Sequence, residues 1–139
     1  MNQQETKMSE HLEVLLLDDE PIVGKRLKPA LEKIGCNVEV FENPHTALER
    51  IDQKLFDGVV SDIRMDDIDG IQILDHVIKK SQHTKVILIT GYAMMSLARE
   101  AMEKGAFDFI AKPFQPDDLR MVIAKAAKAL GSTVNFDKK

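Results

Sequence analysis

The sequence predicts a single α/β domain in which parallel strands and helices alternate along the chain. The chain has 139 residues, of which 44% are hydrophobic, and this is enough for one core but too little for two folded domains. Short apolar runs, typical of strands buried on both faces, alternate about five times with longer segments whose apolar residues recur at helical spacing. This alternation is typical of a doubly wound parallel sheet with right-handed crossovers and helices on both faces.

Five segments are predicted to be strands because they are short, rich in branched apolar side chains and bounded by polar or turn residues. They are residues 12–17, 38–41, 56–61, 85–89 and 107–111. The first of them, LEVLLL, is followed directly by acidic residues. The fourth is the clearest strand.

Helices are expected after each strand. They open at Pro21, at Asn43–Pro44 and at Gly70, and the last two span residues 93–104 and 116–130. In the first helix we expect four apolar residues on the core side, Pro29 to kink the helix and Gly35 to follow its end. These four residues are Ile22, Leu27, Leu31 and Ile34.

The domain is predicted to span residues 12–130, between a flexible extension at 1–11 and a polar tail or linker stub at 131–139. The extension lacks the apolar centre of a secretory signal, and no apolar run approaches the roughly 20 residues that cross a bilayer. A net charge of −4 disfavours direct nucleic-acid binding by this domain, which would need clustered cations. We therefore expect a cytoplasmic protein without membrane contact, and the single cysteine, Cys36, is expected to be buried.

Polar residues of complementary chemistry follow four of the five strands. They are Asp18, Asp19 and Glu20 after the first strand, Asp62 after the third, Thr90 after the fourth and Lys112 after the fifth. Taken singly, each has an ordinary interpretation as a helix cap, a turn residue or a solvated lysine. Because the carboxyl ends of parallel strands meet at one edge of a sheet, their joint occurrence there favours a functional site.

The expected chemistry of this site follows from its charges. Carboxylates within a few ångström of one another repel, so a cation should neutralise them. Oxygen ligands without a nearby histidine or cysteine favour Mg²⁺, and the four histidines are scattered without metal-ligand spacing. Asp62 lies centrally enough to attack phosphorus and form an aspartyl-phosphate, while the metal and Lys112 neutralise charge on the transferred group.

Four motifs resemble the signature stations of bacterial response-regulator receiver domains, and the similarity covers about residues 13–130. They are LDDE at 17–20, SDIRM at 61–65, ITGY at 89–92 and AKPF at 111–114. The resemblance implies a flavodoxin-like fold with strand order 2-1-3-4-5 and five helices. It also implies a phosphoacceptor signalling domain of a two-component system rather than an enzyme, in which Asp62 accepts a phosphoryl group from a sensor histidine kinase or a phosphotransfer protein.

The metal ligands implied by the resemblance come from three parts of the chain. Asp19 and Asp62 would bind Mg²⁺ directly, and the backbone carbonyl of Arg64 would be the third protein ligand. Asp18 would act through a metal-bound water.

The resemblance also implies a switch. Thr90 would turn its hydroxyl onto the phosphoryl group, Lys112 would pair with the same group, and the ring of Phe109 would follow Thr90. The surface made by the helix at 93–104, the strand at 107–111 and the last helix would then change, to control a partner or an output domain. A homodimer through that surface is expected as one outcome.

Further expectations concern the residues around the phosphoryl group. The peptide bond before Pro113 would be cis, and Gly91 would leave the approach to phosphorus open. Arg64 and Tyr92 could obstruct an attacking water, so we predict slow self-dephosphorylation. Many relatives carry proline where this chain has Asp66, so the loop at 65–70 is more acidic, and a solvated loop is its favoured interpretation.

Other functions share parts of this pattern. A Mg²⁺-dependent phosphatase that works through an aspartyl-phosphate usually has an acid/base aspartate two residues after the nucleophile, where this chain has Arg64. A phosphate-independent scaffold is disfavoured by the intact acidic motifs, and a flavin-binding domain by the sparse aromatic residues. Both a stand-alone regulator and a receiver attached to an output domain fit the sequence.

Overall fold

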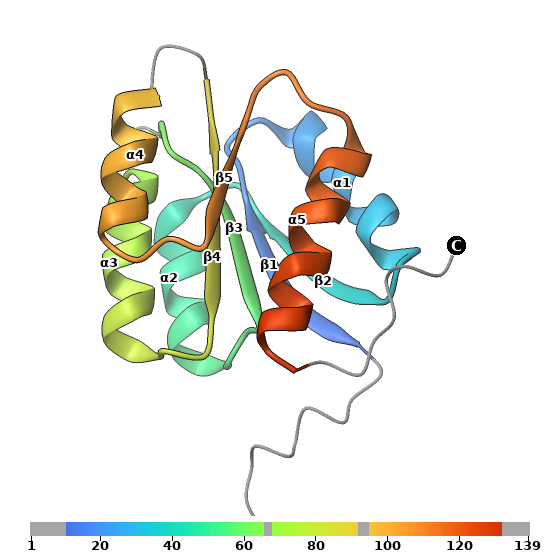
Figure 1. Ribbon diagram of the computed structural model, residues 1–139, viewed down its shortest axis with the longest axis horizontal. Coiled ribbons are helices and arrows are strands. Elements are labelled where there is room, and N and C mark those ends of the chain that lie inside the picture. The colour runs from blue at the N-terminus through green and yellow to red at the C-terminus, as the bar shows by residue number, and fades with distance from the viewer. Residues whose placement is uncertain (1–10, 66–67, 92–94, 132–139) are drawn as a thin grey trace, which may run out of the picture.

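In a computed structural model, the protein is a five-stranded parallel sheet with helices on both faces (Figure 1). The structure describes residues 11–65, 68–91 and 95–131. The strands are β1 (Leu12–Leu17), β2 (Cys36–Phe41), β3 (Gly58–Asp62), β4 (Lys85–Thr90) and β5 (Asp108–Ala111). The helices are α1 (Pro21–Glu32), α2 (Pro44–Gln53), α3 (Gly70–Lys80), α4 (Met95–Glu103) and α5 (Pro116–Ala129). The strand order is β2-β1-β3-β4-β5, which confirms the predicted fold.

The sheet separates two hydrophobic cores. Helices α1 and α5 cover one face, and α2, α3 and α4 cover the other (Figure 1). Because successive side chains of a strand point to opposite faces, Leu15 and Leu17 of β1 join the core under α2, α3 and α4, whereas Val14 and Leu16 join the core under α1 and α5. Burial on both faces explains why β1 is an almost continuous apolar run.

Local caps fix where the helices begin. Asn43 caps α2 by accepting a hydrogen bond from the backbone N–H of His45 at 2.7 Å. Asp69 and Gln72 form a capping box at the start of α3. Because α3 starts directly after the loop that follows β3, this capping box also anchors the far end of that loop.

Several bounds differ from the prediction. Strand β2 begins at Cys36, two residues early, and β3 extends to Asp62, so that Asp62 closes the strand instead of following it. Helix α1 passes through Pro29 and ends at Glu32, and Gly35 after it has a positive φ of 105°. The expected helix at 93–104 is α4 from Met95 onward, and its first two expected residues lie outside the described ranges.

The prediction for Ile22 was wrong. Ile22 is 60% exposed, whereas Leu27 and Leu31 are buried in the core. At 3.6 residues per turn, Ile22 lies about 140° around the helix axis from Leu27, so it falls outside the core-facing stripe. Val23 and Gly24 occupy the core side of that first turn instead.

Other expectations about burial hold. Cys36 is buried, and burial raises the pKa of its thiol to about 12, so the thiol stays protonated near neutral pH. Two histidines pair with acids: His76 lies 2.7 Å from Asp52 and His83 lies 2.8 Å from buried Asp57. None of the described helices has the length and apolar character required to span a membrane.

Candidate functional site

The four strand-end positions predicted from the sequence meet at the carboxyl edge of the sheet. Asp18 directly follows β1, and Asp62 and Thr90 are the last residues of β3 and β4. Strand β3 lies between β1 and β4, and Thr90 pairs with Ala111 of β5, the residue before Lys112. The parallel register therefore brings side chains from four different parts of the chain to one place.

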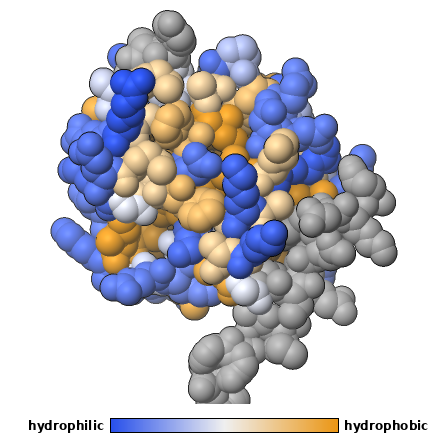
Figure 2. Space-filling model, viewed as in Figure 1, coloured by the Kyte–Doolittle hydropathy of each residue, from blue (hydrophilic) through white to orange (hydrophobic). Residues whose placement is uncertain are grey.

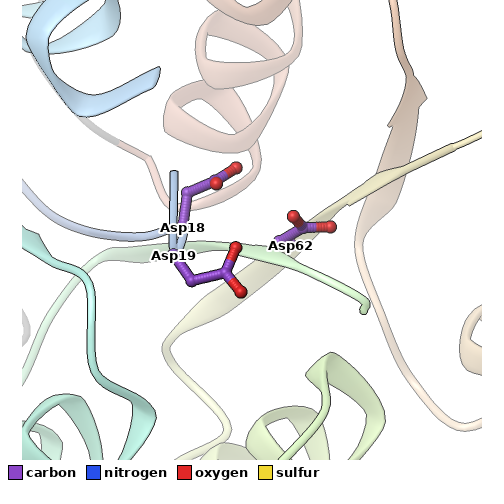
Figure 3. A group of neighbouring side chains, drawn as sticks. All are labelled: Asp18, Asp19 and Asp62. Atoms are coloured by element: carbon purple, nitrogen blue, oxygen red, sulfur yellow. The ribbon is translucent and has the colours of Figure 1, made fainter. Parts of the chain in front are cut away.

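Three carboxylates converge at this edge. Asp18, Asp19 and Asp62 each present an oxygen, and these oxygens all lie within 4.8 Å of one another. Figure 3 shows the three side chains around one shared space between the ends of β1 and β3. Asp18 and Asp62 are only 2% and 7% exposed, whereas Asp19 is exposed. The cluster is thus half inside the protein and open on one side.

Asp18 is held in an electrostatically unfavourable environment. Its Oδ1 accepts a hydrogen bond from the backbone N–H of Glu20 at 2.9 Å, but its buried Oδ2 has no hydrogen-bond partner among the described residues. Desolvation by burial, reinforced by the nearby charge of Asp62, raises the pKa of Asp18 to about 6. A buried carboxylate oxygen of this kind is what a cation in the cluster would satisfy.

Asp62 combines burial with a nearby cation. Burial raises the pKa of its carboxyl group, while Lys112 and a hydrogen bond from the backbone N–H of Arg64 to Oδ1, at 3.3 Å, oppose that rise. Its Oδ2 lies 3.3 Å from Lys112 Nζ. One oxygen of Asp62 thus faces the ammonium group, and the other is held by the loop that follows β3.

Lys112 is the central cation of the site. Its Nζ lies 3.3 Å from Asp62 Oδ2, 3.5 Å from Asp18 Oδ2 and 3.2 Å from Glu20 Oε1. Desolvation opposes its charge, but the surrounding carboxylates outweigh that effect and raise the pKa of Lys112, so it is charged near neutral pH. The Lys112–Pro113 peptide bond is cis.

Thr90 and Phe109 occupy neighbouring strands below the edge. Thr90 is fully buried, and its hydroxyl donates a hydrogen bond to the carbonyl of the next residue, Gly91, at 3.0 Å. Its own carbonyl accepts from the backbone N–H of Lys112 at 2.7 Å, which links the ends of β4 and β5. Phe109 is partly buried and packs against the core under α2, α3 and α4.

The remaining predicted residues surround the cluster. Arg64 is exposed, and a side chain at Gly91 would meet no described atom within 4 Å, so the space beside Gly91 is open. Tyr92, Asp66 and Asp67 lie outside the described residues.

Two features of the site were not predicted. The contact between Glu20 and Lys112 joins side chains 92 residues apart, and Glu20 had been interpreted only as one of the acids after the first strand. Gly70 packs so closely on β3 that a Cβ there would lie 2.7 Å from the backbone oxygen of Asp62 and 2.8 Å from the Cα of Ile63. The glycine itself was visible in the sequence, but only the packing of α3 on β3 shows why it is needed.

The donor set fits a hard divalent cation. The acids that converge offer oxygen atoms only, and one of them has a buried oxygen without a hydrogen bond. Oxygen ligands of this kind suit Mg²⁺, which retains part of its water shell and therefore accepts a half-open site.

Comparisons with known proteins agree with this arrangement. A family profile described as the response regulator receiver domain matches residues 14–124. The regulatory protein AtoC of Escherichia coli is 37% identical over 113 residues, which are 81% of this chain and 24% of AtoC. The transcriptional regulatory protein FixJ of Bradyrhizobium diazoefficiens is 32% identical over 115 residues, 83% of this chain and 56% of FixJ.

A solved structure supports the same assignment. The crystal structure of a response regulator receiver domain protein from Clostridium thermocellum superposes with a TM-score of 0.81 at 29% identity, and the match covers 85% of this chain and 95% of that one. The chain spans only about a quarter of AtoC and just over half of FixJ, so the similarity concerns their receiver region. Fold, acidic pocket and family profile together show that the chain belongs to the response regulator receiver domain family.

Proposed function

We propose that this chain is the phosphoacceptor of a two-component pathway, with Asp62 as the residue that takes the phosphoryl group. The donor would be the phosphohistidine of a sensor histidine kinase or of a phosphotransfer protein. The observation that carries the proposal is the convergence of Asp62, two further aspartates and Lys112 at one edge of the sheet. Membership of the receiver family supports it.

The acids would hold a magnesium ion. Asp19 and Asp62 would be direct ligands with the backbone carbonyl of Arg64, and Asp18 would contribute through a bound water. When bound, Mg²⁺ supplies positive charge that offsets the negative charge on the transferred phosphoryl group. The buried Oδ2 of Asp18 has no hydrogen bond among the described residues, and its ion pair with Lys112 Nζ is as long as 3.5 Å, which supports a cation at this position.

In the transfer step a carboxylate oxygen of Asp62 attacks phosphorus. A new O–P bond forms while the P–N bond of the phosphohistidine breaks, and the imidazole nitrogen leaves with the electron pair. Lys112 Nζ, 3.3 Å from Asp62 Oδ2, is near enough to pair with the transferred group. The reaction ends with an aspartyl-phosphate on Asp62.

The phosphoryl group would then operate a switch. Among the described residues, the Thr90 hydroxyl donates to the carbonyl of Gly91, and the new acceptor oxygens offer it a stronger, charged partner. Turning toward that partner moves the Thr90 side chain and leaves space beneath α4, which the ring of Phe109 fills. Phe109 already packs against the core on this face of the sheet.

The surface that would carry the signal is made by α4, β5 and α5. Figure 2 shows apolar side chains across the centre of the face on which Figure 1 places these elements, with hydrophilic side chains around them. Met102 of α4 and Met121 of α5 are 39% and 63% exposed. Methionine adapts to different partners, so this surface suits a second copy of the chain or an output domain.

Sedimentation with and without an acyl-phosphate mimic tests the dimer. An unchanged molecular mass on addition of the mimic contradicts it.

The donor protein would dock beside Lys112. A pocket of about 460 Å³ adjoins the site there, and its lining includes the charged residues Glu20, Arg26 and Lys112 and the apolar residues Ile22, Val23, Leu27 and Phe114. Ile22 is exposed at this position. A partner that brings a phosphohistidine to Asp62 must cover this edge of the sheet, and the pocket offers it apolar contact area.

The decisive experiment is incubation with acetyl phosphate and Mg²⁺ followed by intact-mass measurement. We expect the wild type to gain one phosphoryl group and Asp62→Asn to gain none, and EDTA should prevent the reaction. Labelling that persists in Asp62→Asn, or its absence in the folded wild type, would contradict the proposal. The slow self-dephosphorylation expected from Arg64 and Tyr92 is tested in the same assay by the lifetime of the acyl phosphate in wild type and Arg64→Ala.

A further inference from the structure

We propose that Glu20 is a positioning residue that holds Lys112 in the unphosphorylated protein and competes with the phosphoryl group for it. The proposal rests on the proposed role of Asp62 as phosphoacceptor. It assigns to the contact between Glu20 and Lys112 a brake on phosphorylation.

The backbone of Glu20 is fixed on both sides. Its N–H donates to Asp18 Oδ1 at 2.9 Å, and its carbonyl accepts from the N–H of Val23 at 3.0 Å. Glu20 is the N-cap residue of α1, yet its side chain makes no capping hydrogen bond. The carboxylate is therefore not used for the helix, and it reaches across the edge of the sheet to Lys112.

Among the described residues, three carboxylates contact Lys112, and Glu20 makes the shortest of these contacts. Glu20 Oε1 lies 3.2 Å from Nζ, compared with 3.3 Å for Asp62 and 3.5 Å for Asp18. It is also the only one of the three that is largely exposed, with 62% of its side chain accessible. An exposed carboxylate is well solvated when it releases the ammonium group, so this contact can break at little cost.

Glu20 is not one of the converging acids, which among the described residues are Asp18, Asp19 and Asp62. Glu20 instead lines the adjoining pocket together with Lys112. Phosphorylation replaces the single negative charge of the Asp62 carboxylate with the roughly 1.5 to 2 negative charges of a phosphoryl group near Nζ. Lys112 must then give up Glu20 to face the new group, and the lost contact slows the approach to the phosphorylated state.

Three variants separate this contact from a general effect of charge. Glu20→Asp keeps the charge but shortens the side chain by one methylene, so the carboxylate no longer reaches Nζ. Glu20→Gln removes the charge. Glu42→Gln is the control, because Glu42 directly follows β2 at the same edge of the sheet, is exposed and loses the same charge.

The first measurement is the initial rate of phosphorylation by acetyl phosphate at saturating Mg²⁺, in which an Asp62 O–P bond forms and acetate leaves. An exposed ion pair is worth little, so we expect Glu20→Asp and Glu20→Gln each to be about two- to fivefold faster than wild type. Glu42→Gln should match the wild type. A Glu20→Asp rate equal to wild type, whatever the rate of Glu20→Gln, would overturn the proposal.

The second measurement needs neither metal nor phosphodonor. Reductive ¹³C-methylation gives each lysine an NMR signal, and the Lys112 signal is assigned by its loss in Lys112→Arg. We expect both Glu20 variants to shift this signal in EDTA and Glu42→Gln to leave it in place. If the signal shifts as expected but no variant accepts a phosphoryl group, the contact is real and the proposed function fails. If the wild type is phosphorylated but the signal does not move, the role of Glu20 fails alone.

Discussion

At the scale of single residues, the carboxyl group of Asp18 is sensitive to whether a cation is bound beside it. It is almost fully buried, its Oδ2 has no hydrogen bond among the described residues, and its pKa is raised to about 6. A carboxyl group with a raised pKa favours folding below its unfolded pKa of 3.8. That contribution is lost as the pH rises through about 6. In the metal-free protein at pH 8, the ionised Asp18 therefore destabilises the fold.

We predict that Asp18→Asn stabilises the metal-free protein. In EDTA at pH 8 the free energy of unfolding should rise by about 1–3 kcal/mol, because the neutral amide avoids the buried charge and can still accept the hydrogen bond from Glu20. The difference should largely disappear at about pH 3, below the unfolded pKa of 3.8, where Asp18 is mostly protonated in both states. Urea denaturation at the two pH values measures it, with Asp75→Asn on the exposed side of α3 as the control. A less stable Asp18→Asn protein in EDTA at pH 8 would show that its charge is already compensated.

The site residues at strand ends could be predicted because their positions depend only on where the strands end in the sequence. Parallel strands place their last residues at one edge, so Asp62, Thr90 and Lys112 needed only a correct reading of the strands. The contact of Glu20 with Lys112 could not be predicted in this way, because it depends on the side-chain reach of two residues on different elements. The orientation of Thr90, which now bonds Gly91, depends equally on the packing around it.

Among the secondary-structure elements, β1, β2 and α2 are joined by a chain of ion pairs. Glu39 of β2 lies 2.7 Å from Arg50 Nε and 3.0 Å from Lys54 Nζ, and Lys54 lies 2.8 Å from Glu13 of β1. The hydrogen bond from Arg50 is the main cause that lowers the pKa of Glu39 to about 2. A lowered pKa means stability that is present above the unfolded value of 4.5 and lost as the pH falls through about 2.

We predict that Glu39→Gln weakens the attachment of α2 to the sheet. The free energy of unfolding should fall by about 0.5–1 kcal/mol at pH 7, the upper range for ion pairs that remain partly solvated. The loss should shrink toward zero as the pH approaches 2 and should decrease in high salt. Thermal unfolding across this pH range measures it. Glu49→Gln, an exposed change on α2, is the control, and an equal loss in both variants would contradict a specific role of Glu39.

Helix α1 carries a prediction about partner choice. Ile22→Ser should slow phosphoryl transfer from a phosphohistidine donor protein that phosphorylates the wild type, by about tenfold, because a central apolar contact is worth about 1–2 kcal/mol. Phosphorylation by acetyl phosphate should not change, because a small donor does not need the apolar contact area that Ile22 offers to a protein at the pocket. Leu55→Ser is the matched control, since Leu55 is similarly exposed but does not line the pocket. Equal slowing with both donors would place the effect in the site itself.

The strands were predicted more accurately than the buried face of helix α1. The strand lengths were predicted within two residues because apolar runs mark them directly. The position of Ile22 was misjudged because an apolar residue in the first turn of a helix was assigned to the core without its angle around the helix axis. The buried side chains of α1 are Leu27 and Leu31. Gly24, which has no side chain, lets the helix pack closely against Val40 of β2.

For the molecule as a whole, the acids at the sheet edge link folding to cation binding. An ion that binds the folded protein alone stabilises it by mass action, by about 2.7 kcal/mol at 100 times the dissociation constant. We therefore predict that Mg²⁺ raises the melting temperature of the wild type beyond the effect of NaCl at equal ionic strength. Asp19→Asn should reduce this rise, because it removes the exposed member of the cluster. Equal melting temperatures in the two salts would argue against a cation site.

The fold as a whole could be predicted in class but not fully in topology. Alternating strands and helices require a parallel sheet with helices on both faces, and they limit the handedness of each crossover. They do not specify which strand neighbours which, so the order came from the resemblance of four motifs to receiver domains. The structure places β1 between β2 and β3, and this is what puts Asp18 next to Asp62.

The close packing of α3 on β3 has a mechanical consequence. The bare Cα of Gly70 lies against the backbone oxygen of Asp62, with no room for even a methyl group between them. Any larger residue would push α3 away from β3 and shift the backbone of Asp62, and with it the carboxylate of that residue. The position of the Asp62 carboxylate at the sheet edge therefore depends on the absence of a side chain at Gly70, eight residues later in the chain.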